Sequence, residues 1–82
     1  AQYYAGEAWA CPPEQALSQD ECKLAGDVVG YEYAKVIYAG YKPTGCFWQT
    51  DKKAYWNRKH GAVADRPFKG RMGAICKAAS DQ

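Results

Sequence analysis

The sequence predicts an α+β domain in which one N-terminal helix is linked by a disulfide to a small antiparallel sheet. Three observations support this: four widely spaced cysteines, a strong helix-start signal near residue 18, and aromatic strand-like segments in the second half. At 82 residues the chain has room for one hydrophobic core, so we expect a single domain over residues 1–82. A core of this size is marginal by itself, and disulfides are a common remedy.

The four cysteines are Cys11, Cys22, Cys46 and Cys76, separated by 10, 23 and 29 residues. Zinc sites usually draw their ligands as close-spaced pairs, so this spacing favours two disulfides over a metal site or free thiols. Of the three possible pairings we favour Cys11–Cys76 with Cys22–Cys46, because the second bond then joins the predicted helix to a predicted strand. Loop-closure entropy gives about 4.4 and 3.5 kcal/mol for the two bonds, but it does not choose the pairing.

The first elements are an aromatic arm and the helix. Residues 1–10 carry two tyrosines and a tryptophan, so we expect this arm to pack on the body or to pair as an edge strand. Ser18 and Glu21 form a capping box that predicts a helix over residues 19–29, ended by Gly30. Gly26 lets another segment pack closely. By spacing, the core-facing side of this helix holds Cys22, Ala25 and Val29, with Leu24 and Val28 extending the stripe.

The remaining elements are strands. The tyrosine-rich segment 31–41 favours a strand at 35–39, although it could continue helically. Segments 45–50 and 54–57 predict a hairpin with its turn at 51–52 and with Gln49 opposite Ala54. In that register one face of the hairpin holds Cys46, Trp48, Tyr55 and Asn57. The other face holds Phe47, Gln49, Ala54 and Trp56. The first face would meet the helix, and the second would be covered by the arm or exposed. We expect a last strand at 74–77 and a frayed tail at 78–82.

Four short motifs occur in a fixed order: ECKLAG, PTGCFW, AYWN and ICK. Their order over residues 11–77 resembles small secreted four-cysteine modules of microbial eukaryotes. It is also similar to modules of the PAN/apple type, in which a helix is linked to a small antiparallel sheet, although this chain lacks their additional cysteines. Likeness to PAN/apple modules implies binding to proteins or carbohydrates. The resemblance identifies no catalytic residue.

Charge is divided unevenly along the chain. Residues 1–41 carry six acidic and two basic side chains, a net of −4, whereas residues 42–82 carry nine basic and three acidic ones, a net of +6. A basic half suggests an anionic partner, unless the halves neutralise each other or are simply solvated. Aromatic rings of the hairpin lie beside these cations and could anchor a ligand or instead form the core, as we expect for Trp48 and Tyr55. The candidate binding residues are Phe47, Trp56, Lys52, Lys53, Arg58, Lys59, Arg66, Lys69 and Arg71.

Signals for catalysis are weak, so we expect no enzyme. Ser18 is the predicted helix cap, and His60 beside Asp51 or Asp65 is the one conceivable acid–base pair. No phosphate-binding loop, dinucleotide fingerprint or calcium loop occurs, and we expect no cofactor and no metal. No apolar run approaches the length of a membrane span, so none is expected.

The sequence therefore predicts a non-enzymatic binding or assembly module in an oxidising compartment, either extracellular (secreted) or another oxidising lumen. We expect it to dock an anionic glycan or an acidic protein surface, in one version as a small subunit of a larger complex. The compartment argues against a nucleic-acid partner. Two alternatives remain: a secreted effector (toxin, antimicrobial or protease inhibitor), and an enzyme that depends on His60.

Overall fold

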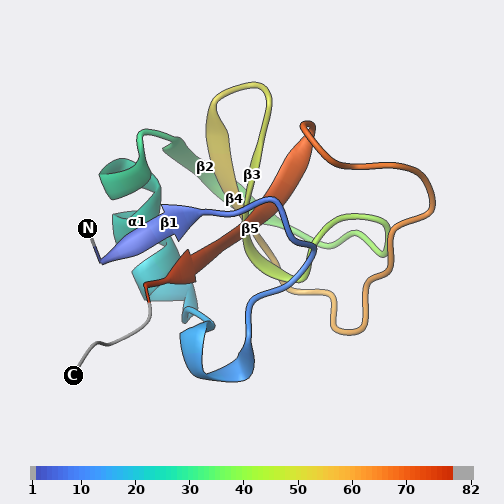
Figure 1. The fold of residues 1–82 in the computed structure, drawn as a ribbon, viewed down its shortest axis with the longest axis horizontal. Coiled ribbons are helices and arrows are strands. Elements are labelled where there is room, and N and C mark those ends of the chain that lie inside the picture. Colours follow the sequence, from blue (N-terminus) through green and yellow to red (C-terminus); the bar gives the residue numbers. More distant parts are fainter. Residues whose placement is uncertain (1, 79–82) are drawn as a thin grey trace.

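A five-stranded sheet in the order β1-β5-β3-β4-β2, with one helix packed on it, makes up the fold (Figure 1). The computed structural model describes residues 2–78. The elements are β1 (Tyr3–Ala5), a short 3₁₀ helix (Pro13–Gln15), α1 (Gln19–Val29), β2 (Glu32–Ile37), β3 (Gly45–Gln49), β4 (Lys53–Asn57) and β5 (Met72–Lys77). The α+β class, with the helix joined to the sheet by a disulfide, is confirmed. No helix among the described residues has the length and apolarity needed to cross a membrane.

The helix begins and ends where the sequence predicts. The Ser18 side chain accepts a hydrogen bond from the Glu21 backbone, the Glu21 carboxylate accepts one from the Ser18 backbone, and Gly30 ends the helix in the left-handed conformation. The Ser18 backbone N–H and the Lys77 ammonium, 3.3 Å away, lower the pKa of Glu21. Gly26 allows close packing as expected, because a Cβ there would lie 2.8 Å from the Tyr31 carbonyl oxygen.

One part of the helix prediction is wrong. Cys22, Ala25 and Gly26 are buried against the sheet, but Leu24 and Val28 are 55% and 48% exposed. With about 100° between successive residues, Leu24 lies on the side of α1 opposite the buried stripe. The narrow sheet covers only one side of the helix, so the predicted stripe is too wide.

Both predicted disulfides are present, and they lie on opposite faces of the sheet. Cys22–Cys46 joins α1 to β3, and Cys11–Cys76 joins the segment after β1 to β5. The described chain has no free cysteine. These bonds are consistent with an oxidising compartment.

The sheet contains three antiparallel pairs and one parallel pair, so it is mixed rather than wholly antiparallel. Of the two arrangements predicted for the N-terminal arm, the structure shows the edge strand: β1 runs antiparallel to β5. The tyrosine-rich strand lies at 32–37 rather than 35–39, pairs parallel with β4, and forms the other edge.

The last strand begins two residues earlier than predicted. The Ala78 N–H donates to the Gln2 carbonyl, and residues 79–82 of the predicted tail lie outside the described part of the chain.

The hairpin prediction has the right strands but the wrong register. Gln49 pairs with Lys53, not with Ala54, because the connection is a three-residue turn in which Lys52 adopts a positive φ of 67°. The Asp51 carboxylate stabilises this turn by accepting the Lys53 N–H at 3.0 Å. A shift of one residue places every β4 side chain on the face opposite to the predicted one. Consequently Trp56 shares the helix face with Cys46, whereas Phe47 lies on the other face, as predicted.

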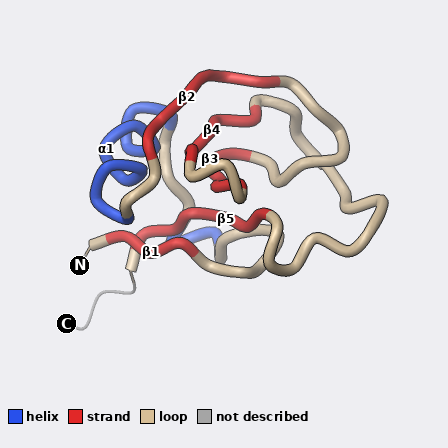
Figure 2. Tube along the Cα trace, turned by 90° about the horizontal axis from the view of Figure 1, so that it is seen from above, coloured by secondary structure: helices blue, strands red, loops and turns tan. Residues whose placement is uncertain are grey.

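The two faces of the sheet are covered differently. On one face, α1 contacts all five strands and encloses a core that includes Cys22, Trp48, Ala54 and Ile75. The other face carries no α-helix among the described residues, and the segment after β1 is joined to it by Cys11–Cys76. Figures 1 and 2 show the long β2–β3 and β4–β5 connections gathered at the end of the molecule away from α1. This loop end holds the pocket described next.

Candidate functional site

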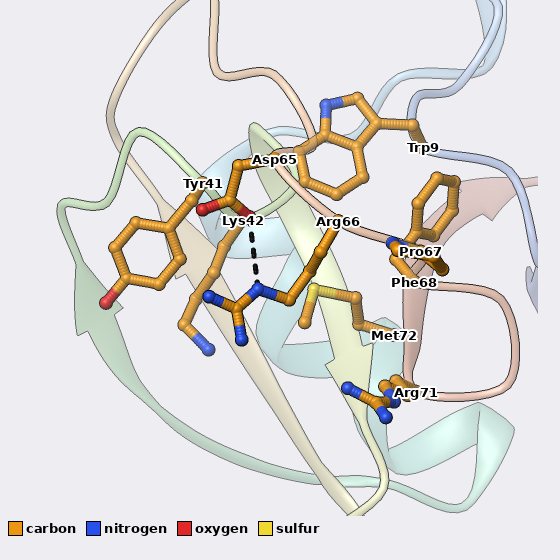
Figure 3. A pocket seen from close by; sticks show the side chains of 9 residues that line it. All are labelled: Trp9, Tyr41, Lys42, Asp65, Arg66, Pro67, Phe68, Arg71 and Met72. Atoms are coloured by element: carbon orange, nitrogen blue, oxygen red, sulfur yellow. Dashed lines mark ion pairs between the residues drawn. The ribbon is translucent and has the colours of Figure 1, made fainter.

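A pocket of about 460 Å³ opens among the loops near the beginning of β5 (Figure 3). Its volume lies within the range usual for ligand-binding pockets. Four separate parts of the chain supply its walls: the segment after β1, the β2–β3 loop, the β4–β5 loop and the start of β5. The lining residues are Trp9, Tyr41, Lys42, Asp65, Arg66, Pro67, Phe68, Arg71 and Met72.

Trp9 and Phe68 form an apolar wall. Their ring centroids are 4.9 Å apart in an edge-to-face arrangement, which aromatic pairs prefer. The Trp9 indole N–H donates to the Ala62 carbonyl oxygen at 2.9 Å, which fixes the ring against the β4–β5 loop. The segment that carries Trp9 is held to β5 by the Ala74 N–H to Ala8 carbonyl bond of 2.9 Å and by the Cys11–Cys76 disulfide. The wall is therefore built on fixed backbone.

Asn57, at the end of β4, holds the two long loops together. It is 1% exposed and its amide makes four hydrogen bonds to backbone groups. Its Nδ2 donates to the carbonyls of Ala39 and Lys42, at 2.7 and 3.0 Å, and its Oδ1 accepts from the N–H groups of Ala39 and Lys59, at 3.0 and 3.1 Å. The Thr44 hydroxyl adds a second link, donating to the Lys59 carbonyl and accepting from the Ala62 N–H. The buried Asn57 side chain thus ties the β2–β3 loop, which carries the pocket residues Tyr41 and Lys42, to the start of the β4–β5 loop.

The pocket carries three cations and one carboxylate. Asp65 contacts the neighbouring Arg66 at 3.6 Å, as the dashed line in Figure 3 shows, and both side chains are more than half exposed. Lys42 donates instead to the neutral Gln49 amide, with Nζ 2.7 Å from Oε1. Within residues 2–78 the ion pairs are Asp65–Arg66 and Glu21–Lys77, so Lys42 and Arg71 have no acidic partner there. The pocket therefore has a surplus of positive charge beside an apolar wall.

A short polar network lies beside the pocket at the hairpin turn. The Tyr55 hydroxyl donates to the Asp51 carboxylate, and this hydrogen bond raises the pKa of Tyr55. The Asp51 carboxylate is thus bound within the turn, and the Asp65 carboxylate is paired with Arg66. The conceivable acid–base pairing of His60 with either carboxylate is not formed in the structure.

The predicted binding residues separate into several groups. Arg66 and Arg71 line the pocket, and the exposed Lys69 lies between them in the β4–β5 loop. Lys52 and Lys53 lie at the hairpin turn, about 16 Å along β4 from Arg58 and Lys59 at its other end.

Several of these cations already have contacts of their own. Lys52 lies 5.7 Å from the Tyr31 ring centroid and Arg58 4.8 Å from that of Tyr38. The Lys59 ammonium donates to the His60 carbonyl. None of these three side chains lines the pocket.

The two predicted aromatic anchors are not exposed platforms. Phe47 is completely buried, with its ring stacked on Tyr55 at a centroid distance of 5.5 Å, so it is not available to a ligand. Trp56 is partly buried and packs against the helix-side core. The shifted hairpin register moves Trp56 to the helix face and places Tyr55 directly opposite Phe47.

Trp9, Tyr41, Lys42, Phe68 and Met72 line the pocket but are absent from the predicted binding set. One signal does point toward Phe68: a lone aromatic residue after a proline, inside a run of three cations, is an unusual loop composition. Nothing comparable marks Lys42 or Met72.

No family model, curated protein or solved structure matches this chain. The resemblance to small secreted four-cysteine modules and to PAN/apple modules therefore stays a prediction. Among residues 2–78, no three histidine, cysteine, aspartate or glutamate side chains gather in a way that could hold a metal ion.

Proposed function

We propose that this protein is a non-enzymatic binding or assembly module of an oxidising compartment, and that its pocket docks an acidic protein surface. The observation that carries the proposal is the pocket itself, in which Lys42, Arg66 and Arg71 surround an apolar wall with one carboxylate among them. Exclusion of water by the wall strengthens the attraction between those cations and an incoming carboxylate.

Aromatic contacts within the pocket favour a protein over a glycan. Sugar rings bind on open aromatic faces, but the Lys42 ammonium lies over one face of the 57% exposed Tyr41 ring, 5.7 Å from its centroid. Trp9 meets Phe68 edge-on. What the pocket offers instead is apolar depth with cations at its rim, and this arrangement suits an aliphatic side chain flanked by acids. An anionic glycan is the rival outcome of the test below.

The test uses two immobilised-ligand titrations with defined probes. One probe is a short helical peptide with leucine and glutamate on one face, and the other is polygalacturonate. The variant Arg66→Glu with Arg71→Glu is compared with Lys52→Glu with Lys53→Glu, which makes the same change in charge at the hairpin turn, outside the pocket.

We expect the pocket variant to bind the acidic peptide at least about tenfold more weakly than wild type, which is about 1.4 kcal/mol. The control variant should bind within about twofold of wild type, and added salt should weaken wild-type binding. Equal losses in both variants, or binding that salt does not change, would contradict the proposal. Binding to polygalacturonate alone would make the partner a glycan.

A further inference from the structure

The outer surface of α1 carries aliphatic side chains that nothing covers. Leu24 and Val28 lie one helical turn apart and are 55% and 48% exposed. A pair of adjacent exposed aliphatic residues on one helix is a different matter from scattered single ones, which are normal on protein surfaces. The pair marks a surface that gains from being covered.

Acids flank this aliphatic pair on the same side of the helix. Asp20 precedes Leu24 by four residues and Asp27 follows it by three, so all three side chains project from one side, and both acids are exposed. Neither takes part in an ion pair within residues 2–78, whereas Glu21 is paired with Lys77. Lys23, the lysine of α1, lies 5.9 Å from the Tyr33 ring centroid, toward β2. We call Asp20, Leu24, Asp27 and Val28 the acidic helix face.

The acidic helix face and the pocket lie at opposite ends of the molecule. Figures 1 and 2 both place α1 at one end of the long axis and the β2–β3 and β4–β5 loops at the other. The molecule measures 37 × 23 × 22 Å, so the two surfaces cannot meet within one copy. Each one has the chemistry that the other lacks: acids with exposed aliphatic groups on α1, and cations with an apolar wall in the pocket.

From this complementarity we propose that a second copy of this chain is a partner of the pocket, docking its acidic helix face there. Leu24 and Val28 of one copy pack toward Trp9 and Phe68 of the next. A pocket of this size holds side chains rather than a whole helix, so α1 lies across its mouth. This inference rests on the proposed function and identifies the acidic protein surface.

The carboxylates of this contact meet the two arginines of the pocket. Asp20 and Asp27 of the docked helix reach Arg66 and Arg71 at the rim, where Arg71 has no acidic partner among the described residues of its own chain. Charge complementarity of this kind fixes orientation and excludes other registers. The two surfaces differ from each other, so the contact is head-to-tail and continues from copy to copy, as a ring or an open chain, rather than ending in a closed two-fold pair.

Two variants, each defective on one surface, provide the test. In the helix variant, Leu24→Ser is combined with Asp27→Lys; a lysine in the last turn of a helix suits its dipole, so folding is retained. In the pocket variant, Arg66→Glu is combined with Arg71→Glu. All four side chains are exposed, and circular dichroism and thermal unfolding verify that each variant is folded.

Sedimentation velocity is measured for wild type and both variants over a range of concentrations at low salt. Wild type should show an average mass that rises with concentration and returns to the monomer at high salt. Each variant alone should associate at least tenfold more weakly. An equimolar mixture of the two should form a one-to-one dimer and nothing larger, because one intact helix face then meets one intact pocket and the other two ends are blocked.

Three results would overturn the inference: a wild type that stays monomeric at every concentration, variants that associate as wild type does, or a mixture without dimers. The control Lys52→Glu with Lys53→Glu should associate like wild type. If wild type is monomeric yet binds the acidic peptide through its arginines, the self-docking inference fails and the proposed function stands. If the peptide does not bind either, both fail.

Discussion

Asn57→Ala is the substitution whose effect follows most directly from the structure. The Asn57 amide satisfies four backbone groups, two on Ala39 and one each on Lys42 and Lys59. A buried polar group that loses its partner costs about 1–3 kcal/mol. The three partner residues are half-buried, so water can reach part of the vacated space, and the lower end of that range applies. Four groups at about 1 kcal/mol each give a loss of about 4 kcal/mol.

This loss is large for a domain of this size. At about 0.05–0.15 kcal/mol per residue, an 82-residue chain has an unfolding free energy of about 4–12 kcal/mol. Urea denaturation with the disulfides intact, followed by tryptophan fluorescence, measures the difference. Gln49→Ala is the matched control, because it removes another amide, one that accepts from the Lys42 ammonium and binds no backbone group among the described residues, and it should lose less than about 1 kcal/mol. An Asn57→Ala loss equal to that of the control would refute the reasoning.

The remaining predictions concern the helix and its link to the sheet. Cys22→Ser with Cys46→Ser should lower the unfolding free energy in urea by about 3.5 kcal/mol, and no change would show that the bond does not restrict the unfolded chain. Gly26→Ala should destabilise the protein by about 1–3 kcal/mol in thermal unfolding, because the added Cβ would lie 2.8 Å from the Tyr31 carbonyl oxygen. This loss is expected despite the better helix propensity of alanine, and a stabilised variant would contradict that contact. Because the folded pKa of Glu21 is lowered, its contribution to stability is present above the unfolded pKa and is lost as pH falls through the folded value. The unfolding free energy of Glu21→Gln should therefore vary less with pH in the acid range than that of wild type. A curve parallel to that of wild type would argue against this role of Glu21.

Local signals in the sequence predict local structure well here. Ser18 and Glu21 define the start of α1 because the capping box is a short-range arrangement whose partners are three residues apart. The disulfide pairing is also predictable, since Cys22 and Cys46 fall on a helix and a strand that must pack together in so small a domain. That the arm is held to the body follows from the cost of leaving its aromatic rings in water, although this cost does not choose between packing and edge pairing.

Long-range features are harder to predict, for identifiable reasons. The hairpin register depends on Lys52 adopting a positive φ, which lysine seldom does, and one misplaced turn residue moves every β4 side chain to the opposite face. The parallel pairing of β2 depends on which strand lies beside it in space, which its own residues do not encode. The pocket combines Trp9, Lys42 and Met72 from distant parts of the chain, so no sequence window contains it.

We propose above that the pocket, and not the hairpin lysines, receives an acidic partner. A heteronuclear NMR titration with the leucine–glutamate peptide tests it most directly, because the Trp9 indole N–H gives a side-chain signal from within the pocket wall. We predict that this signal and the backbone amides of residues 65, 66 and 68–72 shift in a saturable, salt-sensitive way, while those of Lys52 and Lys53 stay in place. Shifts confined to the hairpin turn, or an unmoved Trp9 signal at saturation, would contradict it.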